Sequence, residues 1–94
     1  MTENEVKEDI KNWLDFNGWY HFPIWQGRYS VKGISDRIAI KKGEILFIEI
    51  KSTTGKLRID QKIFQERISE KGGHYVVARK WEDLSEYIRK NLEV

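Results

Sequence analysis

Two acidic residues and a lysine form the most informative pattern in the sequence. Asp36 and Glu49 lie on either side of the dipeptide Lys42-Gly43, and Lys51 follows Glu49 by two residues. If this dipeptide is a two-residue turn, Asp36 faces Glu49 across a hairpin; a four-residue turn keeps that register, and a three-residue loop shifts it by one. Because side chains alternate along a strand, Lys51 then shares a face with both acids. Two carboxylates placed in this way repel, so we expect one of them to take up a proton or to bind a cation.

The chemistry available to this group is that of phosphodiester hydrolysis. Carboxylates and backbone carbonyls are the ligands that Mg²⁺ and Mn²⁺ prefer, so Asp36, Glu49 and the Ile50 carbonyl are candidate metal ligands. A divalent ion there would lower the pKa of a bound water, and Lys51 would orient the nucleophile or offset negative charge that develops on the phosphate. The alternative is that both acids lie at solvated strand ends and that Lys51 forms a surface ion pair. The spacing alone leaves both interpretations open.

Two further polar residues are candidates for the same site. Glu3 lies three residues before Val6, near the apolar stripe of a predicted helix, and an acid there is a candidate for holding a metal ion or its waters. The alternative for Glu3 is a first-turn acid that the helix dipole favours. Gln61 shares a helical stripe with Phe64 and Ile68, and an inward-facing glutamine needs hydrogen-bond partners that a charged site would supply. The alternative for Gln61 is a boundary position at the helix end.

Basic residues are concentrated in the middle of the chain. The formal net charge is only +2, but residues 28–62 contain nine lysines and arginines against four acids. This distribution favours a polyanionic partner. The loop around Trp25 and Tyr29 mixes aromatic and basic side chains, which suits contact with distorted or branched DNA; packing in the core and a dimer interface are the alternatives. The candidate DNA-contacting residues, for which a solvated face is the alternative, are Arg28, Lys32, Lys56, Arg58 and Lys62.

Hydrophobic periodicity predicts the elements that must position these residues. The spacing predicts helices over residues 3–16, 59–71 and 81–92, the second of them ending at a Gly-Gly pair. Extended segments are predicted over residues 19–25, 35–41, 44–52 and 74–79. The resulting order, α-β-β-β-α-β-α, predicts one α/β domain over residues 1–94, with a small mixed sheet flanked by helices.

Length and composition exclude several classes of protein. A chain of 94 residues has room for one domain, and the absence of cysteine excludes a disulfide framework and a thiolate zinc site. The two histidines are too few and too far apart in sequence to indicate a zinc site. No run approaches the ~20 apolar residues of a membrane helix, and the acidic N-terminus lacks a signal-peptide pattern, so we expect a cytoplasmic protein.

Several short strings of residues carry a family resemblance. They are Gly33-Ile34-Ser35-Asp36, Phe47-Ile48-Glu49-Ile50-Lys51-Ser52, Gly55-Lys56-Leu57, Gln61, Phe64, Gly72-Gly73 and Tyr75-Val76-Val77. Together they resemble the VRR-NUC family of the PD-(D/E)XK nuclease superfamily, and the N-terminal Glu3-x-x-Val6 also suits that family. The sequence departs from the family pattern at Ser35, where proline is usual, and at Arg58-Ile59, where a serine cap is more usual.

The resemblance implies a PD-(D/E)XK restriction-endonuclease-like core and a DNA endonuclease that depends on Mg²⁺ or Mn²⁺. The site residues that it implies are the metal ligands Asp36, Glu49 and the Ile50 carbonyl, the catalytic Lys51, and the supporting residues Glu3 and Gln61.

Free-standing members of the family look like homodimeric Holliday-junction resolvases of bacteria and phages, and by analogy this short chain belongs with them. We therefore expect a homodimer that acts on branched or four-way DNA, since symmetric cleavage of a four-way junction needs two active sites. The alternatives are a less selective or nicking DNA endonuclease of the same superfamily, and a non-catalytic nucleic-acid-binding module.

Overall fold

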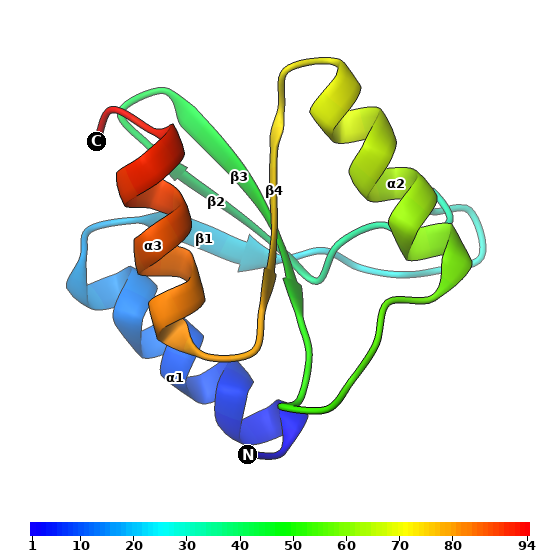
Figure 1. Ribbon diagram of the computed structural model, residues 1–94, viewed down its shortest axis with the longest axis horizontal. Coiled ribbons are helices and arrows are strands. Elements are labelled where there is room, and N and C mark those ends of the chain that lie inside the picture. The colour runs from blue at the N-terminus through cyan, green and yellow to red at the C-terminus, as the bar shows by residue number, and fades with distance from the viewer.

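The chain folds as a four-stranded sheet with helices on both faces. The computed structural model describes all 94 residues and has the predicted order of elements (Figure 1). The helices are α1 (Glu3–Phe16), α2 (Ile59–Glu70) and α3 (Trp81–Asn91). The strands are β1 (Tyr20–Pro23), β2 (Arg37–Lys41), β3 (Glu44–Ile50) and β4 (His74–Ala78). The predicted α/β architecture is confirmed.

The sheet is mixed because its last strand runs parallel to its neighbour. The strand order is β1-β2-β3-β4; the first two pairings are antiparallel, and β4 pairs with β3 in parallel after the crossover through α2. Lys42 and Gly43 form the turn between β2 and β3 with φ angles of 51° and 80°, as a two-residue hairpin turn requires. The ladder pairs Lys41 with Glu44 at one end and Arg37 with Ile48 at the other. The predicted register is therefore correct over the whole of β2.

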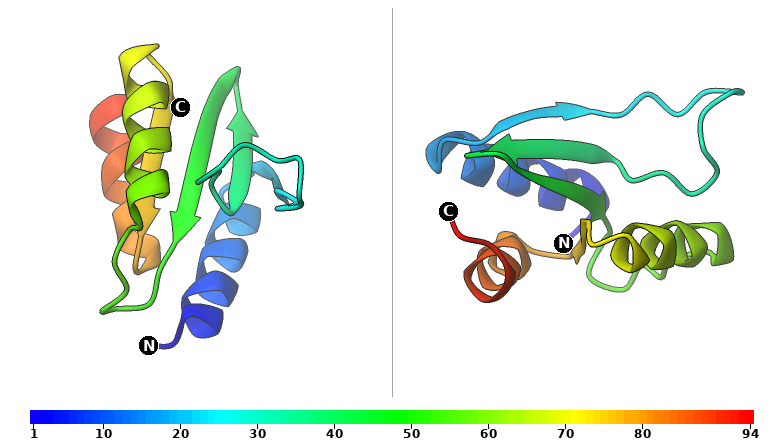
Figure 2. Two further views of the ribbon diagram at one scale, coloured as in Figure 1. Left: turned by 90° about the vertical axis from the view of Figure 1, so that its right-hand side faces the viewer. Right: turned by 90° about the horizontal axis from the view of Figure 1, so that it is seen from above.

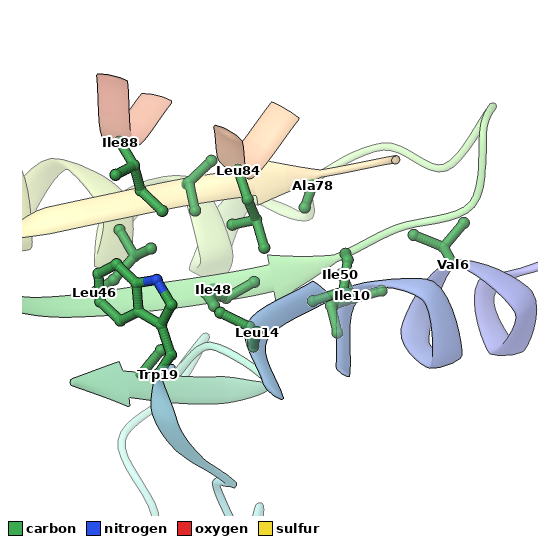
Figure 3. Packing of buried hydrophobic residues seen from close by; sticks show 12 residues of the cluster. Val6, Ile10, Leu14, Trp19, Leu46, Ile48, Ile50, Ala78, Leu84 and Ile88 are labelled. Carbon is green, nitrogen blue, oxygen red and sulfur yellow. The ribbon is translucent and has the colours of Figure 1, made fainter. Parts of the chain in front are cut away.

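Helices α1 and α3 cover one face of the sheet, and α2 covers part of the other (Figure 2). Figure 3 shows the main core between α1, α3 and the sheet, where Ile10, Leu14 and Leu84 pack near Ile48 and Ile50. Burial of this apolar surface supplies the main driving force for folding. None of the three helices has the length and apolar composition needed to span a lipid bilayer.

The opposite face of the hairpin is apolar but less deeply buried. Ile38, Ile40, Ile45 and Phe47 share this face, as predicted, yet Ile45 is 47% exposed. Phe64 of α2 packs edge-on against Phe47, and their ring centroids are 5.8 Å apart. Helix α2 therefore lies on the face to which the odd-numbered side chains of β3 point, and Glu49 and Lys51 continue that series.

Candidate functional site

Three of the predicted site residues form a buried polar cluster where β3 ends and α2 begins. The Gln61 Nε2 donates a hydrogen bond of 3.0 Å to Glu49 Oε2, and Lys51 Nζ lies 3.6 Å from the same oxygen. Glu49 is 2% exposed, Gln61 3% and Lys51 9%. The alternative of a solvated strand-end acid with a surface ion pair is therefore wrong for Glu49 and Lys51.

Asp36 joins the cluster by a route that differs from the predicted pairing. The β2–β3 ladder ends at Arg37 and Ile48, and the Asp36 N–H donates to the Ile48 carbonyl at 2.9 Å. Asp36 Oδ2 accepts a 2.7 Å hydrogen bond from the Ile50 N–H. The prediction that Asp36 pairs with Glu49 in the ladder is wrong, because the Asp36 N–H bonds to the carbonyl of Ile48, the residue that already pairs with Arg37. The hydrogen-bonding pattern is therefore shifted by one residue at Asp36. Asp36 is nevertheless close enough for its charge to raise the pKa of Glu49.

The environment of Glu49 disfavours its charged form. Burial, and then the charge of Asp36, raise the pKa of Glu49 from 4.5 to about 8, although Lys51 lowers it. This agrees with the expectation that one of the two acids takes up a proton or binds a cation. Glu49 Oε1 is buried and has no hydrogen-bond donor within the protein, so the ionised carboxylate has one unsatisfied oxygen.

We predict that the metal-free protein loses stability as the pH rises from 4.5 to about 8 because of Glu49. The pKa is higher in the folded state than in the unfolded state, so over this range the folded state binds more protons and a rise in pH favours unfolding. Relative to that of Glu49→Gln, the free energy of unfolding of the wild type should fall by up to about 1.4 kcal/mol for each pH unit. Urea unfolding of both proteins in EDTA across the range measures the difference. A difference that does not change with pH would contradict the prediction.

The donors at this site fit a hard divalent cation such as Mg²⁺ or Mn²⁺. Glu49 supplies the unsatisfied Oε1, and Asp36 uses only its Oδ2 to hold the Ile50 N–H. The N–H and the carbonyl of one strand residue point to the same side of the strand. The Ile50 N–H bonds to Asp36, so the Ile50 carbonyl also points to the β2 side, beyond Arg37, where the pairing of β2 with β3 ends. No group of three or more His, Cys, Asp or Glu side chains gathers in the structure. A bound Mg²⁺ would therefore complete its shell with water and substrate oxygens, as it commonly does.

Glu3 is not brought into this cluster. It lies in the first turn of α1, and its exposed side chain forms no hydrogen bond or ion pair. The neighbouring Val6 and Ile10 anchor α1 on the core face of the sheet, whereas Glu49 points to the α2 face. The structure gives no support to Glu3 as a third metal ligand, and its position matches the alternative, a first-turn acid.

Gln61 is held by the first turn of its own helix as well as by the site. Arg58, the N-cap residue, makes no side-chain capping bond. Gln61 Oε1 instead accepts a 2.9 Å hydrogen bond from the Arg58 N–H. With its oxygen engaged there, the amide presents Nε2 to Glu49. The alternative of a simple boundary residue is wrong for Gln61, because its side chain links the helix terminus to the buried acid.

Tyr75 lies near the site, although the sequence indicated it only as part of the string Tyr75-Val76-Val77 and not as a site residue. It lies on β4 opposite Phe47, is 4% exposed, and its hydroxyl has no hydrogen-bond partner. Burial, and then the charges of Glu49 and Asp36, raise the pKa of Tyr75 well above its usual value. The phenol therefore lies within the electrostatic reach of both acids. The available signal was a tyrosine directly before the apolar residues Val76, Val77 and Ala78, since a buried hydroxyl needs a polar partner.

We predict that Tyr75→Phe stabilises the metal-free protein by about 1 kcal/mol, because the substitution removes a buried hydroxyl that has no partner. The ring packing against Phe64 is kept. Urea unfolding in EDTA measures the change. A loss of stability would show that the hydroxyl has a partner, such as an ordered water, and would contradict the prediction.

The five predicted DNA-contacting side chains are all exposed, and several lie close to the cluster. Arg58 and Lys62 flank Gln61 at the start of α2. Lys56 follows Gly55, which lies against the Lys51 side chain. A Cβ added at Gly55 would lie 3.4 Å from Lys51 Cβ and Cδ. The guanidinium of Arg79 donates to the Gly55 carbonyl at 2.5 Å and fixes this loop. Arg28 and Lys32 lie in the connection between β1 and β2.

Comparison with protein-family models and with curated proteins finds no match for the chain.

Proposed function

We propose that the protein is a metal-dependent endonuclease that hydrolyses DNA phosphodiester bonds with Mg²⁺ or Mn²⁺. The observation that carries the proposal is the buried Glu49, which has one unsatisfied oxygen and lies beside Asp36 and Lys51. A buried carboxylate that lies beside a second carboxylate is costly to a fold unless a cation or a proton compensates it. A divalent cation fills this role and is also what phosphodiester hydrolysis requires.

The residues of the cluster have complementary roles in this proposal. Asp36, Glu49 and the Ile50 carbonyl would hold the ion, which when bound lowers the pKa of water and stabilises charge on the scissile phosphate. Gln61 orients Glu49 through its 3.0 Å hydrogen bond. Lys51 places a positive charge where negative charge develops as water adds to phosphorus and a P–O bond breaks.

The architecture supports the resemblance that suggested this activity. The α-β-β-β-α-β-α order, the mixed sheet and the position of the acids at the start of β2 and the end of β3 are compatible with a PD-(D/E)XK core. The serine at position 35, where the family usually has proline, is fully buried and its hydroxyl lies 3.4 Å from the Arg37 carbonyl. Ser35 is thus accommodated beside Asp36 without occupying a ligand position.

The exposed basic residues supply the surface that a polyanionic substrate needs. Lys56, Arg58 and Lys62 lie in or just before the first turn of α2, which carries Gln61, and Arg28 and Lys32 lie in the connection between β1 and β2. Contacts of such residues with phosphates release counterions and give binding that weakens with salt.

We predict that Arg28→Ala and Lys56→Ala each lower the salt dependence of DNA binding. Each lost phosphate contact should reduce the slope of log K against log salt by about 0.9 for duplex DNA. Fluorescence anisotropy in EDTA over a series of salt concentrations measures the slope. Lys71→Ala is the matched control, because Lys71 caps the opposite end of α2 and is exposed. An unchanged slope would remove Arg28 or Lys56 from the contact surface.

Selectivity for four-way junctions and assembly as a homodimer are parts of the same proposal. A two-fold dimer would present two sites for symmetric cuts. A cytoplasmic location is the corresponding expectation for a bacterial or phage enzyme that acts on DNA. A less selective or nicking endonuclease would use the same chemistry without the symmetric substrate.

The test is incubation of the purified protein with labelled four-way junction and linear duplex in Mg²⁺ or Mn²⁺, with light scattering to determine the oligomeric state. We expect cleavage that EDTA stops and that favours the junction. Equal cutting of both substrates would support the less selective endonuclease. Binding in EDTA without cleavage in either metal would contradict the proposal and favour the non-catalytic DNA-binding module.

A further inference from the structure

The connection between β1 and β2 exposes two large aromatic side chains. Trp25 is 89% exposed and Tyr29 is 92% exposed. Neither ring packs in the core, so the core-packing alternative is wrong for both. Residues 24–34 contain no acid, and they carry Arg28 and Lys32. Rings that remain in water contribute nothing to folding by burial, and so their exposure needs another explanation.

Both ends of this connection are fixed beside the polar cluster. The Ile24 N–H donates a 2.8 Å hydrogen bond to the carbonyl of Asp36, so Trp25 follows a residue that is bonded directly to the backbone of a site acid. At the other end Gly33 has φ of +76°, and an added Cβ would lie 2.1 Å from the Asp60 carbonyl oxygen in the first turn of α2. Only glycine permits this close approach to the helix that carries Gln61.

The loop between these fixed ends has internal hydrogen bonds. The Ser30 N–H and hydroxyl both donate to the Gly27 carbonyl, and Gln26 Nε2 donates to the Ile34 carbonyl at 3.2 Å. In the right-hand view of Figure 2 the connection extends past the end of the sheet, at the same end of the molecule as α2 but apart from that helix. The aromatic rings are therefore presented on a turn that is anchored next to the site.

We propose that Trp25 and Tyr29 form a stacking platform for DNA bases that are unpaired at the branch point of the substrate, beside the phosphate to be cut. This rests on the proposed nuclease function and specifies its substrate class. Every base has a flat face that stacks on an aromatic ring, whereas the faces of paired bases within a duplex are already stacked on their neighbours. The Arg28 guanidinium lies 5.8 Å from the Tyr29 ring centroid. It lies over one face of that ring, so a base would stack on the other face.

A second copy of the chain is the other partner that exposed aromatics suit. The charge of the loop argues against it, because a symmetric contact of this loop with its own copy would bring the cations Arg28 and Lys32 of both subunits together. The same cations are complementary to a nucleic-acid backbone.

The test is binding of labelled DNA in EDTA, where no cleavage occurs, by the wild type, Trp25→Ala, Tyr29→Ala and the double variant. The probes are a short single strand, a splayed duplex with unpaired arms, and a fully paired duplex. We expect the wild type to prefer the first two, and each substitution to weaken only those by about 5- to 150-fold. Trp25→Phe should restore most of the affinity. Phe16→Ala is the matched control, since Phe16 is 90% exposed at the end of α1.

The outcomes separate this inference from the proposed function. Loss of preference for unpaired DNA in the double variant supports the platform, even if the wild type never cuts DNA in Mg²⁺ or Mn²⁺. Equal affinity for paired and unpaired probes, or unchanged affinity in the double variant, overturns the platform even if cleavage is normal. A change from dimer to monomer in Trp25→Ala by light scattering, without loss of preference, would identify a contact between copies and would also overturn it.

Discussion

Glu49→Gln should lower the rate of metal-dependent DNA cleavage by at least about 1,000-fold. Glutamine has nearly the same shape as glutamate and still offers an oxygen to Gln61, but it has no negative charge with which to bind a divalent ion. Quantified cleavage of labelled DNA under single-turnover conditions measures the loss. Because Glu49 is 2% exposed, the substitution acts within the site and leaves the DNA-facing surface unchanged.

The stability of the same variant separates loss of chemistry from loss of fold. Burial and Asp36 raise the pKa of Glu49 to about 8, so the neutral glutamine should be at least as stable as the wild type near that pH in EDTA. Glu66→Gln, an exposed change on α2, is the matched control and should cut DNA normally. A folded Glu49→Gln protein that retains more than about a tenth of the wild-type rate would refute the role assigned to Glu49.

Lys51→Met should lower the cleavage rate by about 100- to 1,000-fold. Methionine keeps an apolar stem of similar length, but it removes the ammonium group that lies 3.6 Å from Glu49 Oε2. The same loss favours protonation of Glu49, because Lys51 lowers its pKa. Rates must therefore be compared at saturating Mg²⁺, because the loss of Lys51 changes the charge around the proposed metal ligands.

An exposed lysine in the same region is the control for Lys51. Lys62→Met should weaken DNA binding but leave the single-turnover rate at saturating DNA unchanged, because Lys62 lies outside the buried cluster. If Lys51→Met and Lys62→Met differ only in binding, and not in rate, Lys51 has no role in the chemical step.

The hairpin shows how far local sequence could predict this site. The Lys42-Gly43 turn fixes the register of β2 and β3, because both residues adopt positive φ and the paired strands contain no insertion. The register of the hairpin alone does not predict that the Asp36 N–H bonds to Ile48 and that Asp36 leaves the ladder. This departure from the ladder depends on the Asp36 carboxylate, which accepts the Ile50 N–H in place of a backbone ladder bond.

Gln61, Tyr75 and Glu3 show why contacts between distant elements were harder to predict. The helical stripe placed Gln61 on an inward face, but its hydrogen bond to Glu49 depends on how α2 packs on the sheet. Tyr75 lies beside Phe47 through the parallel pairing of β4 with β3, and sequence alone does not fix that register. Glu3 was placed near the site by its spacing from Val6, whereas α1 packs on the core face of the sheet.

The most direct test of the proposed metal centre is an anomalous difference map from crystals soaked in Mn²⁺. Our interpretation predicts a peak within about 2.5 Å of Asp36, Glu49 and the Ile50 carbonyl, with Lys51 and Gln61 beside it, and no peak at that position in Glu49→Gln crystals. No peak in the wild type at a saturating concentration of Mn²⁺, or a peak only at some other place on the molecule, would contradict it.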